Sequence, residues 1–237
     1  MSGSAHSGVE PAFPDARYAG REGLVAIGGD LSPELLLSAY GHGIFPWFDD
    51  DRGPVLWWSP DPRAVLAPTG MKISRSLARR LRRGDYSVTM DADFPAVVEN
   101  CAAPRKGRGT WITPAMRQAY AQLAELGFAH SVETWQAGEL VGGLYGVSLG
   151  RMFFGESMFS RRRDASKVAL AHLSRQLAAW DFELIDCQIV NDHLTSLGAR
   201  PMPRADFLDR LDRNRRRSTR RHPWRFDIST RETRGDP

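Results

Sequence analysis

Residues 129–160 read AHSVETWQAGELVGGLYGVSLGRMFFGESMFS, and this stretch decides the fold. It contains three strand-like runs in succession, Ala129–Trp135, Leu140–Leu149 and Met152–Phe159. Polar residues and glycine separate the first two runs. The pair Gly150-Arg151 separates the last two, which is typical of a two-residue hairpin with glycine first. The stretch therefore predicts an antiparallel meander.

Helical patterns lie on both sides of this meander. Before it, Thr113 and Pro114 open a helix, and after it Ser166 is the predicted cap of a helix with an apolar stripe. A buried-type strand at Phe182–Val190 and a short helix at Asn191–Leu197 follow. The order helix, three antiparallel strands, helix, strand, helix predicts a mixed α/β (α+β) fold, with an acyltransferase domain of the GNAT type.

The first 60 residues are predicted to form a small N-terminal α+β domain that is rich in glycine, proline and aromatic side chains. Its one clear helix has Ser32 at the N-cap and Pro33 at the first helical position. The prolines of Pro60-Asp61-Pro62 indicate a boundary. Residues 61–237 are then the GNAT-like catalytic domain, together with an Arg-rich C-terminal tail.

The composition is that of an ordinary globular protein, with 237 residues, 42% hydrophobic and 25% charged. Only two cysteines occur, Cys101 and Cys187, and the six histidines are scattered, so neither a disulfide framework nor a metal site is predicted. No apolar run approaches the roughly 18 residues that span a bilayer, and the chain does not start like a signal peptide. We expect a cytoplasmic protein without membrane contact.

Positive charge gathers in two segments. From Arg210 to the end, ten arginines face four acidic residues. The predicted helix Ser74–Arg83 carries five arginines and no acidic residue. Such segments attract polyanions, and nucleic acid is the first candidate. A solubilising tail and a solvated helix face are the alternatives, and charge alone leaves both open.

Two glycine patterns bear on the chemistry. Residues 146–150 match the G-x-S-x-G pattern of hydrolases, but a strand follows the serine where that motif requires a helix, so we reject a hydrolase. An acetyltransferase of the GNAT type has a glycine-rich loop whose amides hold the pyrophosphate of coenzyme A. The corresponding residues 160–166 contain no glycine, which indicates an acyl donor other than acyl-CoA.

Two apolar segments carry isolated polar residues. Asp186 and Gln188 lie in residues 184–190 of the predicted strand, where the two-residue period places them on one face about 7 Å apart. Glu156 lies among large apolar residues of the strand 152–159, and Gly155 permits a bulge that would redirect it. Each could be a buried group with a structural partner. Together, on strands expected to be neighbours, they favour a site.

Several motifs in the same order resemble leucyl/phenylalanyl-tRNA–protein transferases, from about Gly23 to Leu211. These motifs are Gly28-Gly29-Asp30-Leu31-Ser32, Gly43-Ile44-Phe45-Pro46-Trp47-Phe48, Trp57-Trp58-Ser59-Pro60-Asp61-Pro62-Arg63, Gly109-Thr110-Trp111-Ile112-Thr113, Gly155-Glu156-Ser157-Met158-Phe159-Ser160, and Leu184-Ile185-Asp186-Cys187-Gln188 with Asn191-Asp192-His193.

The resemblance implies an aminoacyltransferase that moves Leu or Phe from its tRNA to the α-amine of a protein beginning with Arg or Lys. This transfer marks the acceptor protein for degradation by the N-end rule. The resemblance also implies that no cofactor or metal takes part, and we expect a monomer. A free α-amine has a pKa of roughly 7.7–8.0, so a base assists the attack.

The resemblance also implies roles for individual residues. Asp186 and Gln188 withdraw the amine proton and position the reacting groups, and Glu156 lies beside the aminoacyl end. Trp47 and Trp111 surround the terminal adenosine, where stacking contributes about 1–3 kcal/mol. The apolar donor pocket consists of Leu144, Phe153, Leu170, Leu173 and Ile185. The tRNA body is bound by Arg75, Arg79 and Arg82, while the Arg-rich tail has no assigned role.

Two other functions stay open at this stage. One is a CoA-dependent N-acetyltransferase with a degenerate phosphate loop, and the other is an RNA-binding module without catalytic activity. Transfer of leucine from charged tRNA to a peptide that begins with arginine distinguishes all three.

Overall fold

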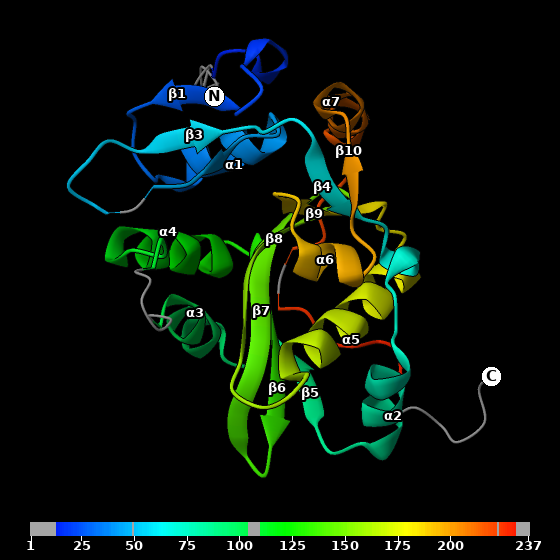
Figure 1. Ribbon diagram of the computed structural model, residues 1–237. Coiled ribbons are helices and arrows are strands. Elements are labelled where there is room, and N and C mark those ends of the chain that lie inside the picture. The colour runs from blue at the N-terminus through cyan, green and yellow to red at the C-terminus, as the bar shows by residue number, and fades with distance from the viewer. Residues whose placement is uncertain (1–12, 49, 104–109, 222, 231–237) are drawn as a thin grey trace, which may run out of the picture.

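Two β-sheets organise the chain in the computed structural model (Figure 1). The structure describes residues 13–48, 50–103, 110–221 and 223–230. The smaller sheet has the order β1-β3-β2, and the larger has the order β10-β4-β9-β8-β7-β6-β5. The strands of the smaller sheet are β1 (Leu24–Ile27), β2 (Phe45–Pro46) and β3 (Leu56–Trp58). Those of the larger sheet are β4 (Arg63–Leu66), β5 (Ser87–Met90), β6 (Ala129–Gln136), β7 (Glu139–Leu149), β8 (Met152–Ser160), β9 (Leu184–Gln188) and β10 (Arg200–Met202).

The predicted meander is confirmed. Strands β6, β7 and β8 pair antiparallel, and Leu149 faces Met152 across the two-residue turn. Helix α5 (Ala165–Ala179) then crosses over, and β9 pairs parallel with β8. A parallel neighbour requires such a crossover, because the chain must return to the same end of the sheet. The observed order of elements is therefore the mixed α/β, GNAT-like order that the sequence predicts.

Two predicted details of this region are wrong. Ser166 is not the cap of α5, because the helix begins at Ala165 after Asp164, whose φ is +62°. The amide of Ser166 donates to Ser160 Oγ instead, at 3.2 Å. The strand predicted at 182–190 is also shorter, since β9 covers Leu184–Gln188 and Gln188 has a φ of +56°. The backbone therefore leaves the extended conformation at Gln188.

The N-terminal helix begins where the sequence predicts. Helix α1 (Pro33–Gly41) has Ser32 at its N-cap, although the Ser32 side chain makes no capping hydrogen bond. The amide of Ser32 donates to Asp30 Oδ1 at 2.9 Å. Helix α1 packs against β2 of the smaller sheet.

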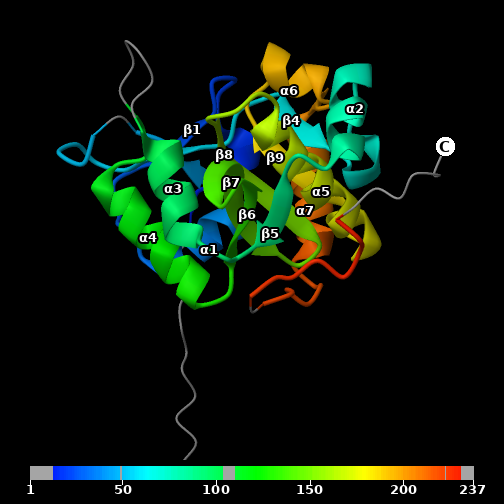
Figure 2. The same ribbon diagram turned by 90° about the horizontal axis from the view of Figure 1, so that it is seen from below.

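Helices cover the two faces of the larger sheet. On one face lie α3 (Phe94–Ala102) and α4 (Pro114–Glu125), and on the other lie α5 and α2 (Arg75–Arg83), as Figure 2 shows. Successive strand residues point to opposite faces. Accordingly, Phe154 belongs to the apolar cluster under α3 and α4, whereas Phe153 belongs to the cluster under α5.

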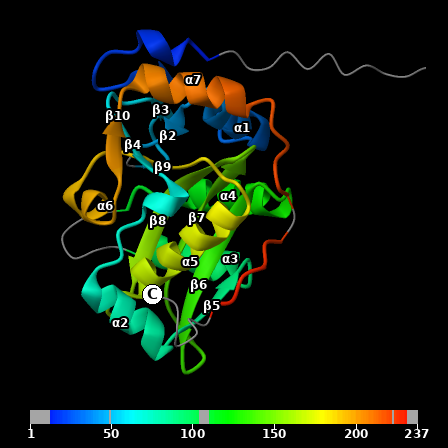
Figure 3. The same cartoon turned by 90° about the vertical axis from the view of Figure 1, so that its right-hand side faces the viewer.

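The C-terminal part of the chain returns to the body of the protein. Helix α6 (Asp192–Ser196) precedes β10, and α7 (Arg204–Asn214) follows it and lies beside α1 (Figure 3). Beyond α7 the chain continues to a buried aromatic residue, Trp224, which is 2% exposed. The predicted tail is therefore anchored on the protein through Trp224, while its described arginines beyond α7 are exposed. Arg231 and Arg234 of that tail lie outside the described residues. Within the described ranges, no helix has the length and apolar character needed to cross a membrane.

A buried ion pair joins two neighbouring strands of the larger sheet, β4 and β9. Arg63 of β4 and Asp186 of β9 are both fully buried, and Arg63 Nε and Nη2 donate to the two oxygens of Asp186 at 2.8 and 2.7 Å. Arg63 Nη1 also donates to Gly43 O at 3.0 Å. The guanidinium lies over the rings of Phe45 and Phe207, at 4.9 and 4.7 Å from their centroids.

We predict that Arg63→Met lowers the free energy of unfolding by about 3–5 kcal/mol, because it leaves Asp186 buried without its partner. The double variant Arg63→Met/Asp186→Leu recovers part of this loss, since it removes both charges. Urea unfolding followed by circular dichroism measures the effect. The matched control is Arg52→Met, which removes the exposed ion pair with Asp50 and leaves the unfolding midpoint unchanged. A wild-type midpoint for Arg63→Met contradicts the prediction.

Candidate active site

Glu156 lies on a β-bulge at the middle of the larger sheet. In the pairing of β7 with β8, Tyr145 faces Ser157 and the next residue, Gly146, faces Gly155, so Glu156 is the extra residue. Such a bulge redirects a side chain out of the regular alternation. The sequence predicts this bulge from Gly155, and the pairing confirms it.

The carboxylate of Glu156 is held by two tyrosines from different helices. Tyr40 of α1 donates to Oε1 at 2.7 Å, and Tyr120 of α4 donates to Oε2 at 2.8 Å. The two phenol oxygens are themselves 2.5 Å apart. Both tyrosines are fully buried, while Glu156 is half-buried. Three elements that are distant in sequence therefore meet at one carboxylate.

This environment changes the protonation of all three groups. Burial raises the pKa of Glu156 to about 7, against the lowering effect of the two tyrosine hydrogen bonds. Burial also raises the pKa of Tyr40 and of Tyr120 well above the ordinary value, and the charge of Glu156 adds to the rise. The phenols therefore stay protonated and keep donating, while the carboxyl group exchanges its proton near neutral pH.

Gln188 connects Glu156 to Asp186. Gln188 Nε2 donates to Glu156 Oε1 at 3.4 Å, and its main-chain amide donates to Asp186 Oδ1 at 3.0 Å. The structure thus brings together all three residues that the sequence predicts to be catalytic. It gives them different surroundings, because Asp186 is fully buried against Arg63 whereas Glu156 and Gln188 are half-buried.

The five residues of the predicted donor pocket lie in a single apolar cluster. They come from β7, β8, α5 and β9, and each is between 0% and 5% exposed. They are Leu144, Phe153, Leu170, Leu173 and Ile185. A Cβ atom placed on Gly155 would lie 4.0 Å from both Ile185 Cγ2 and Phe153 Cε1. The cluster therefore begins one residue away from Glu156.

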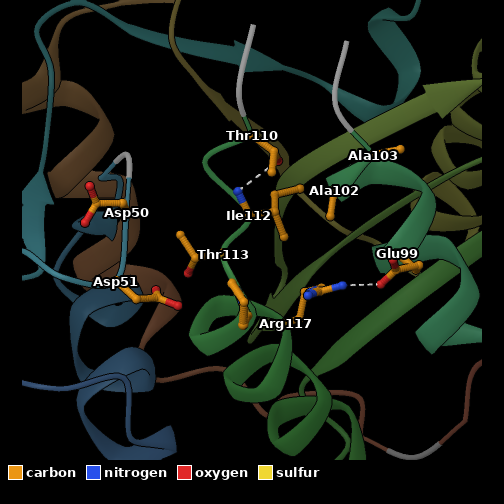
Figure 4. A pocket seen from close by; sticks show the side chains of 10 residues that line it. Asp50, Asp51, Glu99, Ala102, Ala103, Thr110, Ile112, Thr113 and Arg117 are labelled. Carbon is orange, nitrogen blue, oxygen red and sulfur yellow. Dashed lines mark hydrogen bonds and ion pairs between the residues drawn. The ribbon is translucent and has the colours of Figure 1, made fainter.

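The two predicted adenosine-binding tryptophans do not themselves line the pocket of this region, although both neighbours of Trp111, Thr110 and Ile112, do. Trp47 is 41% exposed and packs edge-on against Trp58, with 6.1 Å between ring centroids. Trp111 is half-buried. A pocket of about 380 Å³ opens between the segment that follows Trp47 and the start of α4 (Figure 4). Its lining includes Asp50, Asp51, Glu99, Thr110, Ile112, Thr113 and Arg117. Gly109 of the predicted motif lies outside the described residues.

The arginines of α2 fall into two groups. Arg80 and Arg83 pair with Asp85, at 2.9 and 3.2 Å, so an acidic residue just beyond the basic stretch neutralises part of it. Arg75, Arg79 and Arg82 are exposed on one helix face. Within the described part of the chain, these three make no ion pair. The three residues predicted to bind tRNA are thus the unneutralised ones.

The loop between β8 and α5 differs from a pyrophosphate loop in its hydrogen bonding. The amides of Arg161 and Arg162 both donate to Val141 O, at 2.7 and 3.3 Å. The amide of Ala165 donates to Arg162 O at 3.1 Å. These amides are satisfied within the protein, which agrees with the expectation from the missing glycine. In the described residues, no three His, Cys, Asp or Glu side chains are grouped as a metal site.

Sequence reasoning missed three residues of the site. Tyr40 and Tyr120 are among the buried residues of α1 and α4, where a phenol ring fits an apolar stripe as well as a purely apolar side chain does. The available signal is that a buried tyrosine hydroxyl requires a partner. Arg63 appears in the sequence only as the last residue of a motif. Its role depends on the pairing of β4 with β9, which no local pattern predicts.

Sequence comparisons with family profiles and with individual proteins point to the same family. Residues 65–212 match the profile described as leucyl/phenylalanyl-tRNA protein transferase, and residues 29–61 match the N-terminal domain of that family. The chain is 58% identical to the leucyl/phenylalanyl-tRNA–protein transferase of Nitrosospira multiformis, over 86% of this chain and 88% of that protein. It is 56% identical to that of Anaeromyxobacter sp., over 94% of this chain and 95% of that protein.

Among solved structures, the chain is similar to a GCN5-related N-acetyltransferase from Kribbella flavida. The TM-score is 0.39 at 12% identity, over 72% of this chain and 61% of that one. The sequence matches cover both parts of the chain, and from them we conclude that it belongs to the leucyl/phenylalanyl-tRNA protein transferase family.

Proposed function

We propose that this protein transfers Leu or Phe from aminoacyl-tRNA to the α-amine of proteins that begin with Arg or Lys. Of the three functions that the sequence leaves open, family membership selects the aminoacyltransferase. One observation carries the proposal for the site. A half-buried carboxylate with a pKa near 7, Glu156, lies beside the apolar cluster that suits a Leu or Phe side chain.

The reaction is a displacement at an ester carbon. The neutral α-amine of the acceptor attacks the carbonyl carbon that links the amino acid to the terminal ribose. A C–N bond forms, the ester C–O bond breaks, and the ribose oxygen leaves with a proton that the amine gives up. The ester is already activated, so the enzyme contributes mainly orientation and proton transfer.

We assign the acceptance of the amine proton to Glu156. The two phenols fix its carboxylate, and its pKa of about 7 lies close to that of an α-amine. The side-chain amide of Gln188, which donates to Glu156, positions the reacting groups.

The family resemblance assigns proton withdrawal to Asp186 together with Gln188. Asp186 is fully buried in an ion pair with the Arg63 guanidinium, whereas Glu156 is half-buried and bound by neutral phenols, so we propose that Asp186 acts as a positioning residue. It holds the main-chain amide of Gln188 and thereby fixes the side chain that reaches Glu156.

The substrate-binding residues complete the proposal. Trp47 and Trp111 stack on or enclose the terminal adenosine, and the cluster around Phe153 holds the donor side chain. Arg75, Arg79 and Arg82 bind the tRNA body. We also propose that residues 1–60 and 61–237 are two domains, which meet at the site through Tyr40 and Tyr120, and that the protein acts as a cytoplasmic monomer without cofactor or metal.

The direct test is transfer of radioactive leucine from charged tRNA to a peptide that begins with arginine. The protein is expected to label this peptide and not the same peptide with an acetylated amine. Labelling from leucyl-CoA in place of the tRNA would contradict the proposal.

We predict that Glu156→Gln lowers the single-turnover rate by about 10²–10⁴-fold at pH 7.5, because the amine loses its proton acceptor. The pH profile carries a further expectation. The carboxyl group is protonated below its pKa and charged above it, so the wild-type rate rises as the pH passes through about 7. In Glu156→Gln this rise is absent, and only the titration of the acceptor amine remains. The control is Glu183→Gln, which alters an exposed carboxylate. An unchanged rate and profile in Glu156→Gln excludes the assigned role.

A second prediction concerns tRNA binding. Replacing Arg75, Arg79 and Arg82 together with Gln should reduce the slope of log affinity against log salt by about 2–3, since each lost phosphate contact contributes about 0.7–0.9. The matched control replaces Arg80 and Arg83, which already pair with Asp85, and should reduce the slope much less. Filter binding of leucyl-tRNA between low and physiological salt measures both. Equal slopes for the triple variant and wild type would place the RNA contact elsewhere.

A further inference from the structure

The C-terminal segment, residues 215–221 and 223–230, is fixed to the protein by side chains from several elements. Arg221 donates to Leu126 O through Nε and Nη2, at 3.1 and 2.7 Å. Gln176 Oε1 accepts from the amides of Asp227 and Ile228, at 2.8 and 3.3 Å. The carboxylate of Asp227 accepts from Trp180 Nε1. These contacts lie on both sides of Trp224 and hold it in one place.

Trp224 is the centre of an aromatic group beneath α5. Its ring stacks on His130 at 3.8 Å with an interplanar angle of 8°, and lies 5.1 Å from Trp180 and 5.8 Å from Phe182. The amide of Trp224 donates to Asp91, the residue that also binds His130 at 2.8 Å. Both its backbone and its ring are therefore fixed.

The same ring lies against Phe153. The two centroids are 5.8 Å apart with the planes tilted by 39°, and Trp224 belongs to the apolar cluster that contains all five predicted donor-pocket residues. Phe153 also lies close to the backbone of β7, since a Cβ atom on Gly146 would be 2.6 Å from Phe153 Cζ. Both a strand backbone and a fixed indole therefore contact the Phe153 ring.

We infer that Trp224 is a specificity-determining positioning residue, which sets the depth of the donor pocket by supporting Phe153 from behind. This inference rests on the proposed function, because it assigns the cluster around Phe153 to the donor side chain. An apolar pocket distinguishes side chains only by size and shape. A small displacement of one wall therefore changes the preference between Leu and Phe.

The test is a competition between leucyl-tRNA and phenylalanyl-tRNA for one acceptor peptide, in wild type and in Trp224→Leu. The smaller leucine leaves space next to Phe153, so that its ring can move away from the donor side chain. The ratio of Phe to Leu transfer is therefore expected to increase about 5- to 10-fold. This change is smaller than the roughly 10- to 200-fold discrimination that one methylene group inside a pocket provides. Both donors meet the same enzyme molecules. The ratio is therefore independent of how much of the variant is folded.

The matched control is Phe226→Leu. Phe226 lies in the same segment but packs edge-on against His172, at 6.0 Å, so this variant removes a neighbouring aromatic ring and keeps the contact of Trp224 with Phe153. Its ratio is expected to equal that of wild type. If Trp224→Leu does not fold, Trp224→Phe keeps an aromatic ring with less volume and is expected to give a smaller shift in the same direction.

An unchanged ratio in both Trp224 variants, or equal shifts in Trp224→Leu and Phe226→Leu, overturns the inference. These outcomes are distinct from failure of the proposed function, in which wild type transfers neither amino acid from its tRNA.

Discussion

The buried pair of Arg63 and Asp186 is the interaction on which the rest of the structure depends. A guanidinium in a fully buried position is costly unless its charge is paired and its donors are satisfied. Arg63 meets this requirement only when β4 lies beside β9, the turn at Gly43 presents its carbonyl, and Phe207 of α7 covers the group. One side chain therefore fixes the relative positions of four segments from both ends of the chain.

The site follows from that constraint. Asp186, once paired, holds the amide of Gln188 at the end of β9, and Gln188 reaches the bulged Glu156 of the neighbouring strand. Tyr40 of α1 and Tyr120 of α4 add two phenol hydrogen bonds to the carboxylate of Glu156. The carboxylate thus receives enough hydrogen bonds to be held in place, while its burial still raises its pKa to about 7. A group in this state can accept a proton at neutral pH.

Successive residues of strand β8 point to opposite faces of the sheet and belong to different apolar clusters. Phe154 points toward α1 and packs against Tyr40, with 5.2 Å between ring centroids, so it supports the tyrosines of the site. Phe153 points to the opposite face and packs against Trp224. The bulge at Glu156 follows directly after these two residues. The proposed proton acceptor and the proposed donor pocket therefore lie on the same strand, and the C-terminal segment packs against the proposed pocket.

The sequence by itself determined the elements whose signals are local. Glycine turns and alternating residues predicted the meander, cap and proline signals predicted α1 and α4, and isolated polar residues in apolar strands predicted Glu156, Asp186 and Gln188. The short strands β4, β5 and β10 were not predicted, because three or four residues carry no measurable period. Only the tertiary structure decided that Arg63 pairs with Asp186, that Tyr40 and Tyr120 share Glu156, and that Trp224 supports Phe153. The physical reason is that each of these contacts joins residues separated by at least 36 positions, so that folding alone brings them together.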